Sequence, residues 1–353
     1  MISLYPFFFL QDLYHLNYFH QILSMSKFIY IVAFICLIST FLSANTGPSI
    51  YGVDNDNGQI SILEYDVLLN SYNVISNNVS TNGTINLSSA ILGDNYYFLS
   101  NSSSLISVDL NTGEIENEIE ISLASNFSYF VSDECSNRLY GLRINSGNIE
   151  LRSYNPISGT FQTIGITNSI TGVINATSAI LDGKFYFLGT DGSTPSSFIV
   201  CFDLLTGELT TQLNSAGFTN FHAYENLLYG IIYDSNGNIS INSYDPITGT
   251  IGQISGVITD FLDNNTTGII DNDYYLTGIS AGGIPLLYFV DIETGLLVTV
   301  SNDDRIRLLE TKCSCPSIPT LGQWASICLG LLILVCSAVS LLSINVITHP
   351  IRS

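Results

Sequence analysis

The chain has 353 residues, of which 30 are acidic and 9 are basic, giving a formal net charge of −21 at pH 7. Between Lys27 and Arg138 it contains no Lys or Arg at all. A surface of this kind repels phosphate backbones and anionic lipids, so the composition argues against binding to nucleic acids or to anionic membrane surfaces.

Residues 1–44 are predicted to direct export of the chain. Lys27 supplies the positive charge that opens a secretory signal, the stretch 28–42 is apolar, and Ala44 ends a pair of small residues suited to cleavage. The residues that precede this signal are apolar and aromatic, so we expect translation to begin at Met25. The alternative is that the whole segment forms one long anchor that is not cleaved.

A strand-like phrase that ends in an aromatic residue recurs along residues 45–312. Its tyrosines are separated alternately by 46 and 43 residues: Tyr51, Tyr97, Tyr140, Tyr186, Tyr229 and Tyr275. A period in the forties, with several short strands per repeat, is typical of the blades of a β-propeller. The alternating spacing, and the similarity of 153–160 to 243–250, also indicate duplication of a two-blade block. We therefore predict an all-β fold, a six-bladed β-propeller of four-stranded blades, over residues 45–312.

The fourth repeat shows the strands expected in each blade. We assign them to residues 176–181, 184–188, 197–202 and 208–212, with a turn at 203–207 between the last two. An Asp or Asn is expected to cap each such turn through its side chain, and the Gly that closes the turn is expected to adopt a positive φ. This glycine is present in most of the repeats: Gly113, Gly159, Gly207, Gly249 and Gly295.

The ring is predicted to close by joining the two ends of the repeat region. The first phrase, 49–53, begins at the second strand of a blade, so the first repeat lacks its innermost strand. One spare strand-like segment, 305–309, follows the last repeat. We predict that it pairs with 49–53, because a blade built from both ends of the chain leaves no free sheet edge at the closure.

Two loops carry alternating oxygen side chains around a glycine, a pattern that can bind calcium. The candidate ligands are Asp54 and Asp56 in the first loop and Asp234 and Asn236 in the second. Neither loop has a bidentate Glu at the spacing of a full calcium-binding loop. The alternative, which we favour, is that each loop is a hairpin turn, because Asn-Gly is the strongest short-range hairpin signal. No other cofactor is predicted.

Histidine and cysteine do not form a recognisable catalytic or zinc-binding set. His222 is the one histidine in the repeats and is expected to lie in a strand. Cys135 and Cys201 occur in different repeats, either as two separate thiols or as one disulfide. Cys313 and Cys315 are too close to pair easily with each other, which leaves bridges to the ring or to another chain in an oxidising exterior.

The most specific motif of the chain lies in the predicted linker 313–324. It consists of four consecutive residues and a tryptophan: Ile318, Pro319, Thr320, Leu321 and Trp324. An uncharged apolar run at 325–347 is long enough to cross a membrane as a helix, and the short tail 348–353 carries one basic residue. This arrangement resembles the IPTL-CTERM sorting signal of Gram-negative bacterial surface proteins, although Ala325 stands where that family usually has Gly.

The resemblance implies export, anchoring by the C-terminal helix and processing by a dedicated sorting peptidase of the membrane. It implies nothing about the ligand of the repeat domain. The alternative is an ordinary C-terminal anchor in which Trp324 lies at the membrane interface. Both interpretations place the repeat domain outside the inner membrane, and the first adds transfer to the cell surface or secretion.

Three functions are open to such a chain. The first is a non-enzymatic binding module, anchored or displayed at the surface, that takes a protein, peptide or glycan ligand across one face of the ring. The second is a carbohydrate-active enzyme with paired carboxylates at the ring axis, because such a pair cleaves glycosides without histidine. The third is a structural surface or matrix protein, which the high Asn content suggests. We favour the first because no catalytic set is assembled, a choice that rests on the fold alone.

Overall fold

The computed structural model describes residues 49–56, 59–80, 88–100, 104–120, 127–192, 197–214, 216–259, 262–279, 285–301 and 307–312. The chain divides into two compact units, 1–48 with 67–69 and 49–66 with 70–353. The described part of the first unit is the short turn at 67–69, and all of the described strands belong to the second unit.

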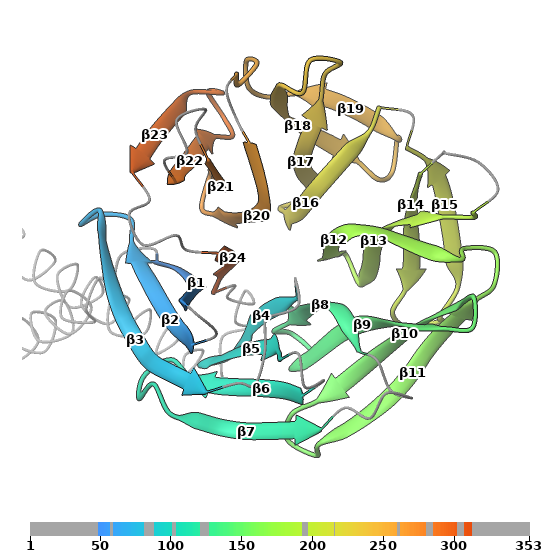
Figure 1. Cartoon of the computed structure of the whole chain (residues 1–353). Coiled ribbons are helices and arrows are strands. Elements are labelled where there is room, and N and C mark those ends of the chain that lie inside the picture. The colour runs from blue at the N-terminus through green and yellow to red at the C-terminus, as the bar shows by residue number, and fades with distance from the viewer. Residues whose placement is uncertain are drawn as a thin grey trace, which may run out of the picture. The chain divides into compact units, whose positions relative to one another are not determined.

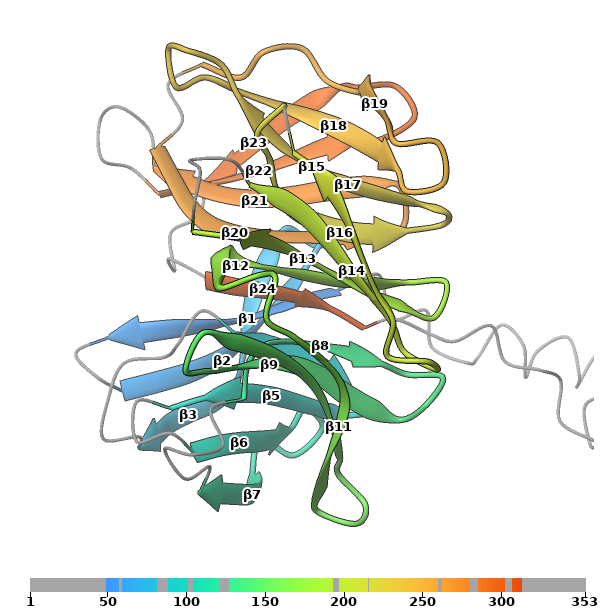
Figure 2. The same cartoon turned by 90° about the vertical axis from the view of Figure 1, so that its right-hand side faces the viewer.

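The described residues of the second unit form six antiparallel sheets of four strands, arranged as blades around a common axis (Figure 1). The predicted six-bladed β-propeller is therefore confirmed. In five blades the strands follow one another in chain order from the axis outward, whereas the first blade takes its inner strand from the C-terminal end. Figure 2 shows the same blades from the side.

The first three blades have the following strands, in order from the axis outward. Blade 1 consists of β24 (Arg307–Thr311), β1 (Ser49–Asp56), β2 (Gln59–Asp66) and β3 (Ser71–Ser80). Blade 2 consists of β4 (Ser89–Leu92), β5 (Asn95–Leu99), β6 (Ser104–Asp109) and β7 (Ile115–Glu120). Blade 3 consists of β8 (Ser128–Asp133), β9 (Arg138–Asn145), β10 (Asn148–Asn155) and β11 (Thr160–Thr167).

The remaining blades follow the same order. Blade 4 consists of β12 (Gly172–Leu181), β13 (Lys184–Thr190), β14 (Phe198–Asp203) and β15 (Leu209–Leu213). Blade 5 consists of β16 (Phe218–Tyr224), β17 (Leu227–Tyr233), β18 (Ile239–Asp245) and β19 (Thr250–Gln253). Blade 6 consists of β20 (Leu262–Ile270), β21 (Asp273–Ile279), β22 (Pro285–Asp291) and β23 (Leu297–Ser301).

The ring closes as predicted, because β24 pairs antiparallel with β1 and supplies the inner strand of blade 1. The register places Thr311 opposite Ile50 and Glu310 opposite Tyr51. The closing strand therefore extends two residues beyond the predicted segment 305–309, whose first two residues lie outside the described ones. Glu310 interrupts the apolar pattern expected of an inner strand, so the predicted strand ended at Leu309.

The turns between the third and fourth strands are capped as predicted. Oδ1 of Asp203 accepts hydrogen bonds from the N–H groups of Leu205 and Thr206 at 3.0 and 2.8 Å. Gly207 closes the turn with a φ of +73°. A side chain on this glycine would place its Cβ 2.3 Å from the carbonyl oxygen of Ile164, so the turn also packs tightly against the outer strand of blade 3.

Apolar clusters fill the seams between blades. In two seams a glycine that follows one of the repeated tyrosines leaves room for a pair of phenylalanines. Phe127 and Phe130 stack at 5.4 Å in the seam between blades 2 and 3. A Cβ on Gly141, the residue after Tyr140, would lie 2.8 Å from the side chains of both phenylalanines. Gly230 has the same role in the seam between blades 4 and 5. The two-blade repeat in the sequence thus produces two alternating kinds of seam.

Candidate functional site

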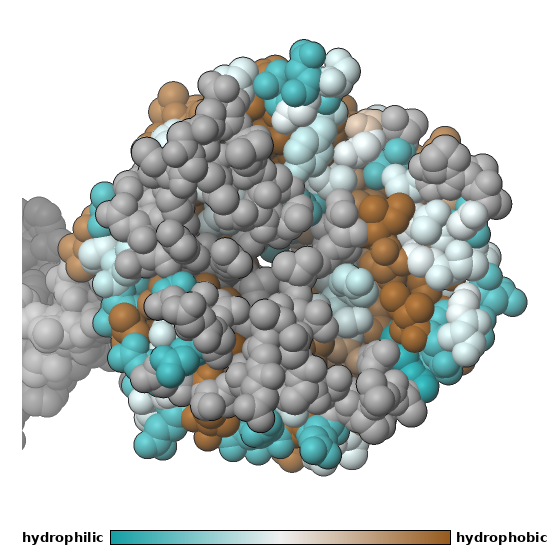
Figure 3. Space-filling model, viewed as in Figure 1, coloured by the Kyte–Doolittle hydropathy of each residue, from teal (hydrophilic) through white to brown (hydrophobic). Residues whose placement is uncertain are grey.

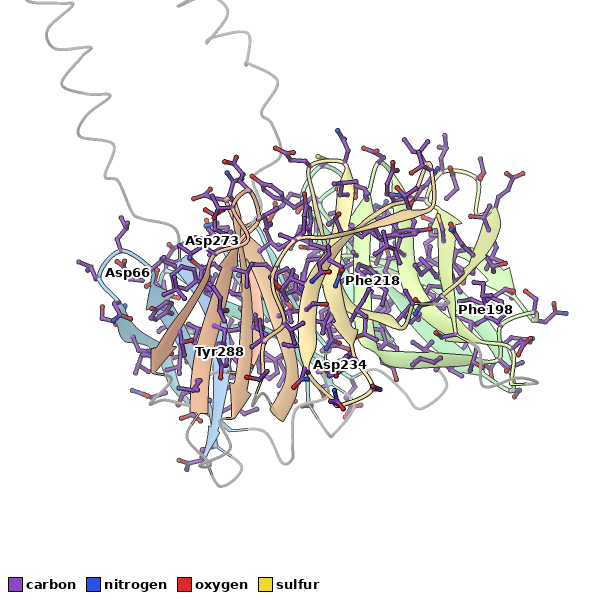
Figure 4. All side chains as sticks on the ribbon, turned by 90° about the horizontal axis from the view of Figure 1, so that it is seen from above. Asp66, Phe198, Phe218, Asp234, Asp273 and Tyr288 are labelled. Carbon is purple, nitrogen blue, oxygen red and sulfur yellow. The ribbon has the colours of Figure 1, made fainter. Side chains whose placement is uncertain are left out.

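The ring has two faces that differ in how the chain crosses them. The turn face carries the hairpins that join the first to the second strand and the third to the fourth strand of a blade. The loop face carries the remaining hairpins and the connections between blades. Figure 4 shows Asp66 and Asp273 on the turn face and Asp234 on the loop face, and the loop face is toward the viewer in Figure 1.

The described ring begins and ends on the turn face. Ser49, the first residue of β1, pairs with Asp66 at the end of β2. Thr311 pairs with Ile50, so Lys312 leaves β24 beside the point where β1 starts. The chain segments on either side of the ring are therefore both attached to this one face, and the loop face carries neither attachment.

The turn face is strongly acidic because its turn caps are ionised. Hydrogen bonds from the backbone and hydroxyl of Thr206 lower the pKa of Asp203. The pKa values of Asp245 and Asp291 are lowered by corresponding hydrogen bonds, first of all from a threonine hydroxyl. These carboxylates stabilise their turns in the charged form, so this face stays negative down to acidic pH.

A group of apolar side chains lies at the loop-face end of the seam between blades 3 and 4. Ile144 in β9 is 38% exposed and Leu213 in β15 is 55% exposed. Ile144 pairs with Ile149, a member of the buried cluster of this seam. Leu213 pairs with Phe198, which packs against the buried cluster of the same seam. We call Ile144, Phe198 and Leu213 the loop-face patch. Figure 3 shows apolar side chains gathered at the right of this face, where Figure 1 places β13 and β14.

The second calcium candidate has the hydrogen bonds of a hairpin turn. Oδ1 of Asp234 accepts from the N–H groups of Asn236 and Asn238 at 2.8 and 2.9 Å, and Oδ2 accepts from the side-chain amide of Asn238 at 2.9 Å. The side-chain bond from Asn238 is the main reason that the pKa of Asp234 is lowered. Gly237 has a φ of +82°, as such a turn requires.

The first calcium candidate lies at the loop-face end of β1. Asp54 pairs in register with Ser61 and is partly buried, while the side chain of Asp56 lies outside the described residues. Among the residues that the structure describes, no group of three or more His, Cys, Asp or Glu side chains is placed to hold a metal ion. Calcium binding by either loop stays a prediction.

The register of the inner strands reveals a position that sequence reasoning missed. Each phrase tyrosine pairs with the same place on the inner strand of its blade, and the residues there are Glu310, Ala90, Val131, Ala179, His222 and Gly268. Four of the six are small or aliphatic, as a buried inner strand requires. Glu310 in blade 1 and His222 in blade 5 are the titratable exceptions, and so they are candidates for a special role.

Glu310 is held by the neighbouring blade. Oε1 accepts a hydrogen bond from the Ser89 hydroxyl at 2.7 Å, which links β24 to the inner strand of blade 2. Burial raises the pKa of the Glu310 carboxyl to about 8, and the bond from Ser89 opposes this rise. The carboxyl is therefore mostly protonated at pH 7. No second carboxylate among the described residues contributes to its pKa, so Glu310 is not part of a coupled pair there.

His222 links blades 5 and 6 in a similar way and lies in a strand, as predicted. Its Nε2 is 2.8 Å from the hydroxyl oxygen of Thr267, and its ring packs against the Tyr274 ring in a T-shaped arrangement. Burial lowers the pKa of His222 to about 4, against the opposing effect of a backbone hydrogen bond with Thr267. The imidazole is therefore neutral at physiological pH, and its contacts are those of a residue that joins two blades.

The arginines of blade 3 form the main basic feature of an otherwise acidic ring. Nη1 of Arg143 lies 3.2 Å from a carboxylate oxygen of Glu150. The guanidinium of Arg152 lies 5.1 Å from the centre of the Phe161 ring, and its Nε and Nη1 are buried without a hydrogen-bond partner. Burial lowers the pKa of Arg152. Guanidinium donors left unused are rare, and sequence spacing gave no sign of them.

The cysteines of the ring differ from both sequence interpretations. Cys135, exposed in the turn between β8 and β9, is disulfide-bonded, whereas Cys201 is a buried free thiol in β14. They are therefore neither two separate thiols nor a bridge to each other. Burial raises the pKa of Cys201, which keeps that thiol protonated and unreactive.

The predicted export signal, the linker 313–324 with its sorting motif, the membrane helix 325–347 and the tail 348–353 all lie outside the described residues. Within the part of the chain that the structure describes, no helix has the length and apolar character needed to span a membrane. The export signal, the sorting motif and the membrane helix therefore stay predictions.

Comparison with known proteins supports the fold. No family model matches the chain, and no curated protein matches it in sequence. The crystal structure of TolB from Acinetobacter baumannii has a TM-score of 0.59 at 11% identity, covering 76% of this chain and 67% of that chain. A chain in the crystal structure of a nidogen–laminin complex has a TM-score of 0.54 at 15% identity, covering 76% and 99%. Identities this low show a shared propeller fold and nothing about activity.

Proposed function

We propose that this protein is an exported, membrane-anchored or surface-displayed binding module that takes a protein, peptide or glycan ligand on its loop face. The observation that carries the proposal is the position of Ser49 and Lys312, which attach both flanking segments to the turn face. A tether on that face leaves the loop face directed away from the anchor. The expected signal at 1–44 and the sorting motif with its helix at 325–347 supply export and anchoring.

The loop-face patch is the contact surface that we propose for the ligand. Apolar side chains exposed beside a packed seam give an interface a rigid anchor, because the strands beneath them do not move on binding. The solved nidogen–laminin complex supports the idea that a chain of this fold can take part in a protein–protein complex. The predominantly acidic surface favours ligands that are neutral or carry basic groups.

A pair of leucines in blade 4 allows a matched test. Leu213 lies in the loop-face patch, and Leu205 lies on the turn face with 93% of its surface exposed. We expect the detergent-extracted full chain to bind defined components on glycan and peptide arrays. Leu213→Arg should reduce that binding at least tenfold, whereas Leu205→Arg should leave it unchanged. Absence of binding by the wild type, or an equal loss with Leu205→Arg, would contradict the proposal.

Export has a separate test. A cysteine introduced at Leu205 should react with a membrane-impermeant maleimide in cells whose outer membrane has been opened and whose inner membrane is intact. Reaction only after the inner membrane is lysed would place the ring in the cytoplasm and refute the proposed location.

The array experiment is also run with and without calcium. Binding that requires calcium would add the candidate calcium ligands to the proposed site, which are Asp54, Asp56, Asp234 and Asn236.

A further inference from the structure

The guanidinium of Arg152 lies in the seam between blades 2 and 3. Arg152 is in β10, on the same side of the strand as Tyr154, which belongs to the buried cluster of this seam. Its Cζ lies 5.1 Å from the centre of the Phe161 ring, and Phe161 packs against the same cluster. The guanidinium therefore rests on the blade 3 wall of the seam.

Both walls of this seam carry buried polar atoms that the described residues leave without a hydrogen-bond partner. On blade 3 these atoms are Nε and Nη1 of Arg152, a residue that keeps part of its surface exposed, so a ligand can reach it from solvent. On blade 2 the atom is the hydroxyl oxygen of Ser107, which is 1% exposed. Ser107 lies on the same side of β6 as Leu105, a member of the cluster, so it faces this seam. Unpartnered buried groups are rare, and their meeting in one seam indicates a place for a further polar group.

The charge of Arg152 is not balanced by the described residues. Glu150 is the one carboxylate among them that acts on the pKa of Arg152, and its Oε2 already pairs with Arg143 at 3.2 Å. Two guanidinium groups therefore share one carboxylate. Burial and the charge of Arg143 lower the pKa of Arg152, but a guanidinium remains protonated at physiological pH. A partly buried positive charge without a counter-charge destabilises a fold, so the seam favours a negative group.

We propose that Arg152 binds the carboxylate of a small ligand in the seam between blades 2 and 3, with the Ser107 hydroxyl as a second donor. Phe161 covers one face of the guanidinium, so strong hydrogen bonds form in its plane, where a carboxylate accepts from two N–H groups at once. A single negative charge balances the single unpaired positive charge. A doubly charged phosphate would add negative charge to a chain whose formal net charge is already −21.

This carboxylate site is separate from the loop-face patch, which lies in the seam between blades 3 and 4. A carboxylate held between Arg152 and Ser107 would join blades 2 and 3, so its binding should stabilise the folded ring. Leu213→Arg, which tests the loop-face patch, should leave this site unchanged. The carboxylate site and the proposed function can therefore fail independently.

Nuclear magnetic resonance tests the binding directly. The detergent-extracted full chain, isotope-labelled at its arginine side-chain nitrogens, is titrated with sodium acetate while sodium chloride keeps the ionic strength constant. We expect the Nε–H resonance of Arg152, identified by its absence in Arg152→Lys, to shift until it saturates. Chloride or phosphate at the same ionic strength should leave it in place. A missing shift with acetate, or an equal shift with chloride or phosphate, would overturn the proposal.

A matched pair of arginines in blade 3 supplies the control for a second readout. Nη1 of Arg138 donates to the Ser153 hydroxyl at 3.1 Å, and Ser153 lies on the same side of β10 as Leu151 of the seam with blade 4. Acetate should raise the thermal unfolding temperature of the wild type and of Arg138→Met equally. Arg152→Met should weaken the response to acetate by at least about tenfold, because the ligand loses its charged partner.

The stability of the variants without acetate separates a binding role from a structural one. Arg152→Met should be at least as stable as the wild type, because an apolar side chain of similar length replaces an unpaired buried charge. Arg152→Lys keeps the charge without the planar fork, so it should fold normally and lose most of the response to acetate. A marked loss of stability or of folding in Arg152→Met would show that the chain itself satisfies the guanidinium, and it would overturn the proposal.

Discussion

Replacement of Glu310 by glutamine tests whether a protonated carboxyl helps to close the ring. The side chain lies in the closing strand β24 and accepts a hydrogen bond from Ser89 of the next blade. Its pKa is about 8 in the folded chain, compared with 4.5 for an ordinary glutamate. Glutamine keeps the size of the acid and a carbonyl oxygen for Ser89, and it cannot ionise. The variant therefore isolates the effect of charge.

The direction of the effect follows from proton linkage. A carboxyl whose pKa is raised by folding binds its proton more tightly in the folded state, so its contribution is complete below pH 4.5 and is lost as the pH rises through about 8. The largest loss of stability that this linkage allows is about 1.4 kcal/mol for each pH unit between the two pKa values. Because Glu310 keeps part of its surface accessible, we take about half of this largest loss, which gives a loss of ~2 kcal/mol between pH 5 and 8.

The assay is chemical unfolding followed by circular dichroism at several pH values from 5 to 9. His222 has a pKa of about 4 in the folded chain and 6.5 when unfolded, so its contribution rises with pH up to about 6.5 and opposes the Glu310 effect there. Subtracting the wild-type profile from that of Glu310→Gln removes this background. We expect equal stability near pH 5 and a more stable variant by ~2 kcal/mol at pH 9. Parallel profiles would refute the reasoning.

Three other predictions concern the turns and seams. Gly207→Ala should destabilise the ring by at least ~3 kcal/mol in the same assay, because its Cβ would contact the carbonyl oxygen of Ile164. The control is Gly159→Ala, which has a similar φ of +66° and open space around its Cβ and should cost ~1 kcal/mol. Equal costs would show that the contact with Ile164 is unimportant. Phe221→Ala should lower the free energy of unfolding by about 3–5 kcal/mol, because the buried Phe221 ring stacks on Phe218. A loss of stability below ~1 kcal/mol would mean that neighbouring side chains fill the space left by the ring. Asp234→Ala should lower the melting temperature by the same amount with and without calcium, because it removes the hydrogen bonds that cap the turn. A melting temperature that calcium raises only in the wild type would instead establish a metal site.

The repeat pattern predicted the architecture well because it depends on local rules. The spacing of the phrase tyrosines reflects the length of a blade, and the Asp-to-Gly turns follow from hydrogen bonding within a few residues. The closing strand was also predictable, since the first repeat lacked one strand and one segment was left over. The predicted end of this strand was two residues too early, because a glutamate is not expected in a buried inner strand. In the folded chain burial keeps the Glu310 carboxyl mostly protonated at pH 7.

The candidate site was less predictable because it depends on which segments meet across seams. Nothing near Ile144 in the sequence shows that Leu213 borders the same seam, which follows from the pairing of Ile144 with Ile149 and of Leu213 with Phe198. In the same way, the unused donors of Arg152 follow from the packing of Phe161 over its guanidinium, which a repeat pattern does not record. Such features are set by tertiary contacts between residues that are distant in the chain.

The closing strand β24 corresponds to the inner strand that the first two-blade block lacks at its N-terminal end. The chain supplies this strand from the other end of the repeat region. In blade 5, His222 pairs with the phrase tyrosine and the buried Phe221 precedes it; in blade 1, Glu310 and the buried Leu309 take these places. The irregularity in the pairing of β16 with β17 also occurs in the pairing of β24 with β1. The last seam is therefore built like its equivalents, with one difference: its inner strand is covalently continuous with the C-terminal segment. A pull on that segment would act first on β24, which its pairing with β1 holds in the ring.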